Sequence, residues 1–348
     1  MTANLRRHPM TPVAPPTVIP DFFSPDEVET IKSVIRSNAP WQMLLAHHFS
    51  STEEYLAVSG GKDRKPGATL SDFVAPVFRG ILANAGVVYY PELNDIYFGR
   101  KLLDTARSLR GCEYGMSYDL LFNICGPSHS FDAGHFDTGS FRGIGLHNSP
   151  IWLLAVMAKS GLFDAWEVKT AQVITYFYDS DIDGGFTYWP DGPDREPARF
   201  EAPFNNTAIL TDNSRMYHRR ESNGARDQRD YPEIDLSSKL YAVGDDEWSI
   251  RNGDTEIRRL EDSDTRMLLH YTALLFDDRE DVRRYQEHTD DLTQRQVCDM
   301  LIADMRSKGI TVADPVDPLT DTTFIAKCTD FYAMAPEIYP AEAPLEKR

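Results

Sequence analysis

Between residues 116 and 276 the sequence consists of short apolar runs separated by turn residues, and no other feature restricts the fold as much. The runs are rich in β-branched and aromatic residues, which favours strands. They are SYDLLFNIC, VITYFYDS, GGFTYWP, TAILTDN, RMYHRRE and TRMLLHYTALLF. One apolar stretch of helical character, IWLLAVMAKSGLFDAW, interrupts the series. Many short strands joined by turns predict an antiparallel core of the jelly-roll type.

Segments of helical character flank this core on both sides. In DFFSPDEVETIKSVIR, Ser24 is typical of a helix N-cap and Pro25 of the first helical position, and an apolar stripe follows. We expect further helices near 70–85 and 93–109, and again over 277–308. The fold class predicted is therefore α+β, with a double-stranded β-helix (jelly roll, cupin-like) core flanked by N-terminal and C-terminal helices.

The chain of 348 residues contains enough apolar material for one large domain, since 41% of its residues are hydrophobic. We expect an extended arm over 1–20, where prolines are frequent, and a single catalytic domain over 21–348. Within this domain lie the jelly-roll core at about 116–276, a polar insertion at about 220–262 and a C-terminal helical extension at about 277–348.

The charge balance limits the partners. With 36 basic and 54 acidic residues the formal net charge is -18, which repels nucleic-acid backbones and anionic membrane surfaces. The sequence shows neither a signal peptide nor an apolar segment long enough to span a bilayer, so we expect a cytoplasmic protein that acts on a small molecule. Its four separated cysteines are expected to be reduced and buried. The amphipathic stretch LTQRQVCDMLIADMR can pack on the core or on a second copy, which leaves a homo-oligomer open.

The segment GHFDTGSFRG contains a histidine and an aspartate two positions apart, His135 and Asp137. On a strand these two side chains share one face while Phe136 points away. An imidazole and a carboxylate that converge, joined by a second histidine, form the facial triad that binds Fe(II). Among the remaining histidines, His218 and His270 lie on late strands and both are candidates for the third ligand. The alternatives are a polar turn for the pair and a half-buried strand position for His218.

The order of these motifs resembles the iron(II)/2-oxoglutarate-dependent dioxygenase superfamily. GHFD is followed by GGFTYWPDG, TAILTDN, RMYH and TRMLLHYTALLF over roughly residues 116–276, and GGFTYWP resembles the prolyl-hydroxylase-like branch. The resemblance implies that His135, Asp137 and His218 are the catalytic metal ligands. Because related halogenases replace the aspartate by Gly or Ala, Asp137 favours oxygenation over halogenation.

The family also binds 2-oxoglutarate through an arginine, whose planar fork grips a carboxylate with two hydrogen bonds. Arg266 opens the last strand of the series, and Arg229 lies 11 residues after His218. We favour Arg266, because Arg229 falls in the loop-like stretch NGARDQRDYP. In this sequence Leu268 stands where the family has a serine, and the interval from His218 to Arg266 is long.

Further site residues follow from strand alternation and the resemblance, each with ordinary core or surface packing as the alternative. For 2-oxoglutarate they are Asn123 and Tyr176, with Tyr178 as a variant of the latter. For the substrate they are Arg142, Trp189 and Arg220.

The activity that the resemblance implies is oxidation, most simply hydroxylation, of a C–H bond in a small molecule. The cofactors are Fe(II), 2-oxoglutarate and O2, with succinate and CO2 released and ascorbate as an accessory reductant. Two other functions remain open: a cupin-like metalloenzyme that does not use 2-oxoglutarate, and a non-catalytic jelly-roll binding protein. The metalloprotease motif HExxH, the phosphate-binding Walker A loop and the hydrolase elbow GxSxG are all absent from the sequence.

Overall fold

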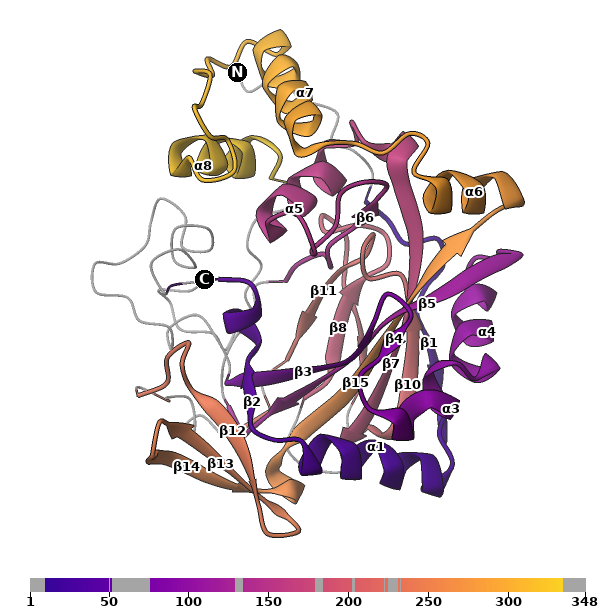
Figure 1. The fold of residues 1–348 in the computed structure, drawn as a ribbon, viewed down its shortest axis with the longest axis vertical. Helices are drawn as coiled ribbons and strands as arrows, with labels where there is room; N and C mark the ends of the chain where they lie inside the picture. Colours follow the sequence, from indigo (N-terminus) through magenta and orange to yellow (C-terminus); the bar gives the residue numbers. More distant parts are fainter. Residues whose placement is uncertain are drawn as a thin grey trace.

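Four long antiparallel strands form the centre of a 12-stranded sheet. In spatial order they are β10 (Phe204–Thr211), β7 (Glu167–Tyr178), β15 (Arg266–Phe276) and β5 (Tyr114–Cys125). This computed structural model describes residues 10–49, 51, 76–128, 134–178, 184–201, 204–221, 223–224, 231 and 233–333. Each of these four strands coincides with one of the apolar runs in the sequence, and Figure 1 shows them side by side.

Shorter strands extend this sheet at both ends. On one side β1 (Thr17–Ile19) pairs with β10. On the other side β3 (Val77–Asn84) pairs with β5 and is followed by β2 (Trp41–Met43). Beyond β2 lies an antiparallel meander of β12 (Lys239–Val243), β13 (Glu247–Asn252) and β14 (Thr255–Glu261), and β4 (Val87–Val88) and β6 (Ser140–Phe141) pair with β3 and β7. The predicted polar insertion therefore contributes three strands to the large sheet.

The prediction of a helix near 70–85 was wrong over 77–84, which form β3; residues 70–75 lie outside the described part of the chain. Phe78 and Leu82 are buried in the core between the sheet and the helices, while Arg79 faces the other side. The strand forms because its partner β5, some forty positions later in the chain, supplies the hydrogen bonds. Such non-local pairing overrides local helix propensity.

A second, three-stranded sheet contains β11 (Tyr217–Arg220), β8 (Phe186–Trp189) and β9 (Ala198–Phe200), in that order. Its inner face packs on the inner face of the large sheet. The apolar cluster between them consists of Ile174, Tyr176, Phe186, Tyr188, Phe204, Ile209 and Met216. The structure is thus a mixed helix and sheet protein with a large antiparallel sheet, as predicted for the α+β class.

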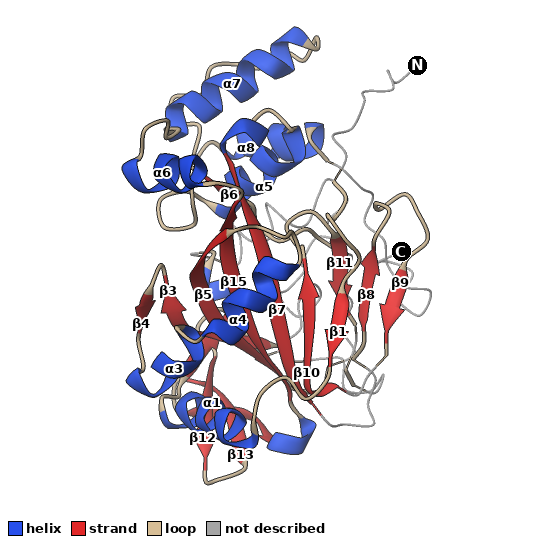
Figure 2. Cartoon of the chain, turned by 90° about the vertical axis from the view of Figure 1, so that its right-hand side faces the viewer, coloured by secondary structure: helices blue, strands red, loops and turns tan. Residues whose placement is uncertain are grey.

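Helices cover the outer face of the large sheet, with α4 (Arg100–Ser108) lying across it (Figure 2). The first helix, α1 (Pro25–Ser37), begins as predicted: Ser24 and Glu27 form a reciprocal capping box, and Pro25 is the first helical residue. The predicted helix at 93–109 is divided into α3 (Asn94–Tyr97) and α4. The described residues also form short 3-10 helices, namely η1 (Leu44–His47), η3 (Pro91–Leu93), η4 (Asp164–Trp166) and η6 (Asp262–Asp264).

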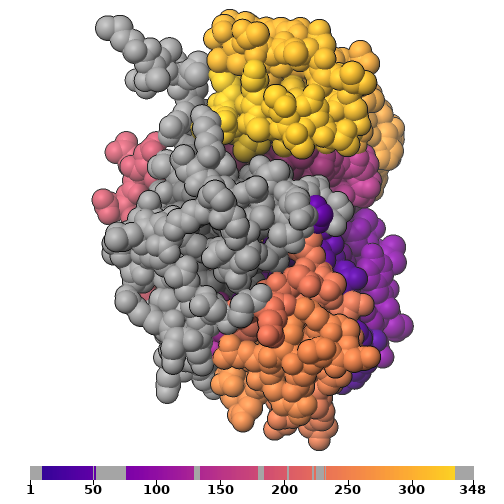
Figure 3. Space-filling view, turned by 90° about the vertical axis from the view of Figure 1, so that its left-hand side faces the viewer, coloured from indigo at the N-terminus to yellow at the C-terminus, as the bar shows by residue number. Residues whose placement is uncertain are grey.

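A second apolar core lies among helices at one end of the molecule. It is formed by α5 (Ile151–Ser160), α7 (Gln294–Ser307) and α8 (Thr322–Phe331), and we call it the C-terminal cluster. The predicted helical segment 277–308 is divided into α6 (Arg279–Glu287) and α7. Figure 3 shows α7 and α8 at the opposite end of one face from the β12–β14 meander. All four cysteines are buried and free, and among the described residues no helix is long and apolar enough to cross a bilayer.

Candidate metal centre

The segment that contains His135 and Asp137 is attached to β11 and to the turn before it. His135 and His218 form an isolated antiparallel bridge, with N–H to carbonyl distances of 2.8 and 3.0 Å. The backbone N–H of Asp137 donates to the carbonyl of Asn213 at 3.0 Å. Between Gly134 and Gly139 strand pairing is limited to this bridge at His135, and the next strand, β6, begins at Ser140. The predicted strand through both His135 and Asp137 is therefore present only at His135. The bridge nevertheless brings two residues 83 positions apart (218 - 135) into contact.

The side chains of His135, Asp137 and His218 converge. One ligand atom from each lies within 4.8 Å of the others, and both imidazole Nε2 atoms are 3.7 Å from Oδ1 of Asp137. His218 is buried, and its Nδ1 lies 2.9 Å from the carbonyl of Met216. Donation from Nδ1–H to that carbonyl fixes the tautomer in which Nε2 carries the lone pair, the form in which an imidazole binds a metal ion. His135 is the exposed member of the three.

Two features of the chain around His135 explain its conformation. Gly134 has a φ of +100°, and a Cβ at this position would lie 2.7 Å from the ring of Tyr217, so glycine is required there. Phe136 points away from the two ligands, as predicted: its ring centroid is 5.3 Å from that of Tyr217, and it packs against the C-terminal cluster. The cluster thereby supports the metal-ligand segment from outside.

Asp137 is surrounded by histidines. Burial raises the pKa of its carboxyl, but His218, His270 and His135 together with a hydrogen bond from Asn213 more than compensate, so that the pKa is lowered overall. The Nε2 atom of His270 is 3.8 Å from Oδ2 of Asp137, and burial lowers the pKa of His270 to about 4. His270 is therefore a neutral neighbour of Asp137, whereas the residues with three converging ligand atoms are His135, Asp137 and His218.

Arg266 is the first residue of β15, and only 3% of it is exposed. Its Nε donates to the carbonyl of Gly184 at 3.0 Å, and its guanidinium carbon lies 4.8 Å from the ring centroid of Tyr176. Among the described residues, no carboxylate is within ion-pair distance of this guanidinium. Burial raises the pKa of the Tyr176 hydroxyl despite the opposing effect of Arg266, so this phenol is a neutral hydrogen-bonding group beside a buried cation. The rival anchor Arg229 lies outside the described residues.

Two of the other candidate site residues predicted from the sequence, Asn123 and Arg220, lie on the inner faces of the large and the small sheet, respectively. Asn123 is directly opposite Leu268 in the β5–β15 pair, and its Oδ1 accepts a hydrogen bond from Nε of Arg79 at 2.9 Å. Arg220 follows His218 on the same face of β11, where it donates to the Asn223 side chain at 3.1 Å. Asn123 therefore contacts an arginine that the sequence analysis did not single out.

Trp189 and Arg142 are placed elsewhere. The register pairs His218 with Tyr188 and Trp189 with Tyr217, so Trp189 is on the face of the small sheet opposite to His218. Arg142 forms a two-pronged ion pair with Asp290, at 2.7 Å through Nε and 2.8 Å through Nη2. This pair ties the segment after Asp137 to the chain before α7. Arg142 and Trp189 thus contact other parts of the fold and not His135, Asp137 or His218.

Sequence reasoning missed Arg79 and His48. Arg79 lies on the inner face of β3 opposite Asn123. Its charge acts to lower the pKa of His270, and the carboxylate of Asp137 acts to raise the pKa of Arg79. Its Nη1 is 3.4 Å from Nε2 of His48. The available signal was a single arginine in the apolar run VFRGILA, which marks a polar position on the inner face of a strand once that run is assigned to the sheet.

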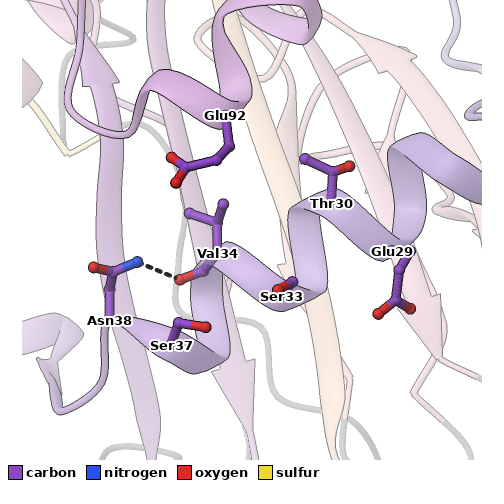
Figure 4. A pocket seen from close by; sticks show the side chains of 7 residues that line it. All are labelled: Glu29, Thr30, Ser33, Val34, Ser37, Asn38 and Glu92. Carbon is purple, nitrogen blue, oxygen red and sulfur yellow. Dashed lines mark hydrogen bonds between the residues drawn. The ribbon is translucent and has the colours of Figure 1, made fainter.

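A shallow groove on the outside of the molecule is separate from this site. It runs along α1 and is lined by Glu29, Thr30, Ser33, Val34, Ser37, Asn38 and Glu92 (Figure 4). Asn38 in this groove donates a hydrogen bond to the carbonyl of Val34 at 2.8 Å. The groove contains none of the residues that surround Asp137.

Two nitrogen ligands and one carboxylate, grouped on one side of a prospective metal ion, are a set that suits Fe(II) and leaves coordination positions open for other ligands. The hydrogen bond from His218 Nδ1 and the Asn213 contact to Asp137 orient two of the three ligands. The arrangement can hold a divalent metal ion, and Arg266 is a buried cation that has no carboxylate partner among the described residues.

No protein-family model and no curated protein matches the sequence. The structure is similar to solved structures of 2-oxoglutarate-Fe(II) oxygenases. One is an oxidoreductase of that family from Burkholderia pseudomallei, with 12% identity over 75% of this chain and 86% of that chain and a TM-score of 0.40. A prolyl hydroxylase from Trichoplax adhaerens has 9% identity over 77% of this chain and 86% of that chain, with a TM-score of 0.37.

A third similar structure is a non-heme alpha-ketoglutarate-dependent carbocyclase from nogalamycin biosynthesis. It has 14% identity over 80% of this chain and 88% of that chain, and its TM-score is 0.40.

Proposed function

We propose that this protein is an iron(II)- and 2-oxoglutarate-dependent dioxygenase that hydroxylates a C–H bond of a small molecule and releases succinate and CO2. The observation that carries the proposal is the combination of two features on the inner side of the sheets. These are the convergent ligand atoms of His135, Asp137 and His218, and the buried guanidinium of Arg266, which lacks a carboxylate partner among the described residues.

The three ligand residues fit Fe(II). Both histidines present Nε2 toward the aspartate, and the tautomer of His218 is fixed by the Met216 carbonyl. Iron bound there would supply the redox chemistry with O2, and His135, Asp137 and His218 would hold it on one side. Asn213 would keep the Asp137 carboxylate in a single orientation through its side-chain hydrogen bond.

Arg266 and Tyr176 fit the far carboxylate of 2-oxoglutarate. The Nε of Arg266 donates to the Gly184 carbonyl, and the guanidinium also interacts with the Tyr176 hydroxyl, so the Nη groups and this phenol together would bind the carboxylate. A buried cation without a counterion is unfavourable, so an incoming carboxylate would be strongly stabilised. Tyr176, a neutral phenol beside the guanidinium, can donate a further hydrogen bond to the same group.

The remaining architecture suits this activity. We assign residues 21–348 to one catalytic domain with a jelly-roll core, in which the two facing sheets form the β-helix and residues 277–348 are an extension. The inner faces of the sheets would exclude water, and loops on this framework would set specificity.

The test is release of succinate from 2-oxoglutarate by the purified full-length chain supplied with Fe(II), ascorbate and O2. Because the substrate is not part of this assay, binding of 2-oxoglutarate is measured as well, by calorimetric titration of the Ni(II)-loaded protein. We expect His135→Ala to lose metal binding and Arg266→Met to retain the metal and lose 2-oxoglutarate.

Different results would point to the alternatives. Metal binding without any 2-oxoglutarate binding would indicate a cupin-like metalloenzyme. Binding of neither would indicate a non-catalytic jelly-roll protein. If Arg229→Met, and not Arg266→Met, removes 2-oxoglutarate binding, the anchor is Arg229.

A further inference from the structure

A second arginine, Arg79, lies on the same inner face of the large sheet as Arg266, but on a different strand, β3. In register, Arg79 of β3 is opposite Asn123 of β5, and Asn123 is opposite Leu268 of β15. Directly opposed residues of adjacent strands point to the same face, so Arg79 shares the inner face with Arg266 and His270. Its charge contributes to the lowered pKa of His270, and the carboxylate of Asp137 acts to raise the pKa of Arg79, so the three groups are electrostatically coupled across this interior.

In the part of the chain that the structure describes, the side chains that contact the Arg79 guanidinium, Asn123 and His48, are uncharged. Its Nε donates to Oδ1 of Asn123 at 2.9 Å, and its Nη1 approaches Nε2 of His48 at 3.4 Å. Among the described residues no carboxylate lies within ion-pair distance of it. The acidic groups that act on it, Asp137 and Asp119, do so from farther away, and Asp119 has its own hydrogen bond from Asn84.

Metal binding would leave the positive charge of Arg79 even less compensated. A divalent ion bound to Asp137 would neutralise the charge of this carboxylate, which has the largest electrostatic effect of any carboxylate on Arg79. The half-buried guanidinium would then be a cation in a poorly solvated position, with its Nη2 donors directed to no acceptor of the described residues. Burial already lowers the pKa of Arg79 to about 10. An anion that enters beside the metal would relieve this cost.

We propose that Arg79, oriented by Asn123 and backed by His48, binds a carboxylate group of the substrate. This inference rests on the proposed function, because it takes the neighbouring three residues as the metal site. It specifies the substrate as a small carboxylic acid, held by its carboxylate on the β3 side while Arg266 holds the cosubstrate on the other.

The charge of this subsite favours a carboxylate over a phosphate. Burial lowers the pKa of His48 to about 4, with Arg79 and His47 acting in the same direction, and burial also lowers the pKa of His47. Both histidines are therefore neutral, and the subsite carries the single positive charge of Arg79. A planar guanidinium fork matches one monoanionic carboxylate, whereas a phosphate dianion would require more cationic groups.

The experiment uses butyrate as the probe and butyramide as its neutral counterpart. The full-length Ni(II)-loaded protein is saturated with 2-oxoglutarate, which occupies the Arg266 site, and the thermal midpoint is followed as each probe is added. We expect a saturable increase with butyrate and none with butyramide. In Arg79→Gln the butyrate affinity should fall roughly tenfold or more, because a charged hydrogen-bonded pair is lost, while 2-oxoglutarate affinity stays unchanged.

Three further variants complete the design. Asn123→Ala should weaken butyrate binding less than Arg79→Gln does, and Arg79→Lys should retain part of it. Arg266→Met, assayed without 2-oxoglutarate, should still bind butyrate although it has lost the cosubstrate. Each variant should therefore lose one ligand and keep the other, which distinguishes the roles of the two arginines.

The inference is overturned if the wild type does not bind butyrate, if butyramide binds equally well, or if Arg79→Gln binds butyrate as the wild type does. It is also overturned if both Arg79 variants fail to fold, since the arginine would then be structural. The two proposals fail separately. A wild type that binds neither Ni(II) nor 2-oxoglutarate refutes the oxygenase, and its butyrate titration in the metal-free state still decides the role of Arg79.

Discussion

Replacement of Arg266 by methionine tests the proposed cosubstrate site most directly. The side chain is 3% exposed, donates through Nε to the Gly184 carbonyl at 3.0 Å, and stacks 4.8 Å from the Tyr176 ring centroid. Methionine fills a similar volume but removes the charge and both Nη donors. Two charge-assisted hydrogen bonds to 2-oxoglutarate would be lost, which corresponds to about 3–5 kcal/mol, or roughly a hundredfold to a few thousandfold in affinity.

The effect on folding should be small by comparison. The variant loses one hydrogen bond and the contact between the cation and the Tyr176 ring, but it no longer buries a charge without a counterion. We therefore expect a change in the free energy of unfolding within about 2 kcal/mol. Calorimetric titration of 2-oxoglutarate into the Ni(II)-loaded variant measures affinity, and urea denaturation measures stability.

One result would refute this reasoning directly: 2-oxoglutarate affinity that remains near the wild-type value in a folded, metal-binding Arg266→Met protein. A large loss of stability together with unchanged affinity in the refolded fraction would assign Arg266 a structural role. Arg266→Lys is the matched control, because it keeps the charge and removes the fork. Its affinity should lie between those of the wild type and the methionine variant.

Three further predictions concern the support of the metal centre. Asn213→Ala should weaken Ni(II) binding about 10- to 100-fold with the fold retained, and unchanged affinity would exclude its role in orienting the aspartate. Gly134→Ala should cost about 1–3 kcal/mol in urea denaturation and impair Ni(II) binding, because φ is +100° and the Tyr217 ring blocks a Cβ; a wild-type titration would contradict this. The Arg142 hydrogen bonds lower the pKa of the Asp290 carboxyl in the folded state, so the unfolded chain binds the proton more tightly. The stability from this pair is present above the ordinary carboxyl pKa of about 3.9 and is lost as the pH falls below it. Asp290→Asn should flatten that acid dependence and leave Ni(II) affinity at neutral pH unchanged, whereas an unaltered pH profile would contradict the assignment.

Local sequence signals predicted the elements whose own residues carry a clear pattern. The capping box of Ser24 and Glu27 set the start of α1, and the runs of β-branched and aromatic residues marked β5, β7, β10 and β15. The strand at 77–84 was missed because its own residues do not show that it pairs with β5. For the same reason the sequence could not show that residues 239–261 extend the large sheet next to β2.

Within the candidate site, the sequence identified the residues by their type and order, and strand register and packing decided their positions in space. The conjunction of His135, Asp137 and His218 was predicted, and the structure brings their ligand atoms together. Alternation within one strand could not show that Trp189 would face away from His218, because the facing of β8 depends on its pairing with β11. Arg142 likewise could not be assigned to Asp290 without knowing that the chain returns there after β15.

The sequence by itself determined which residue types the candidate centre contains: a histidine and an aspartate two positions apart, a late histidine, and an arginine at the start of the last strand. These are properties of residue type and short-range order. Only the tertiary structure decided which groups share an interior. It placed His270 beside Asp137, left Arg266 without a carboxylate partner among the described residues, and turned Arg79 toward the same space from a third strand. The physical reason is that burial, the balance of charge and hydrogen-bond partners depend on strands that are distant in sequence and adjacent only in the folded sheet.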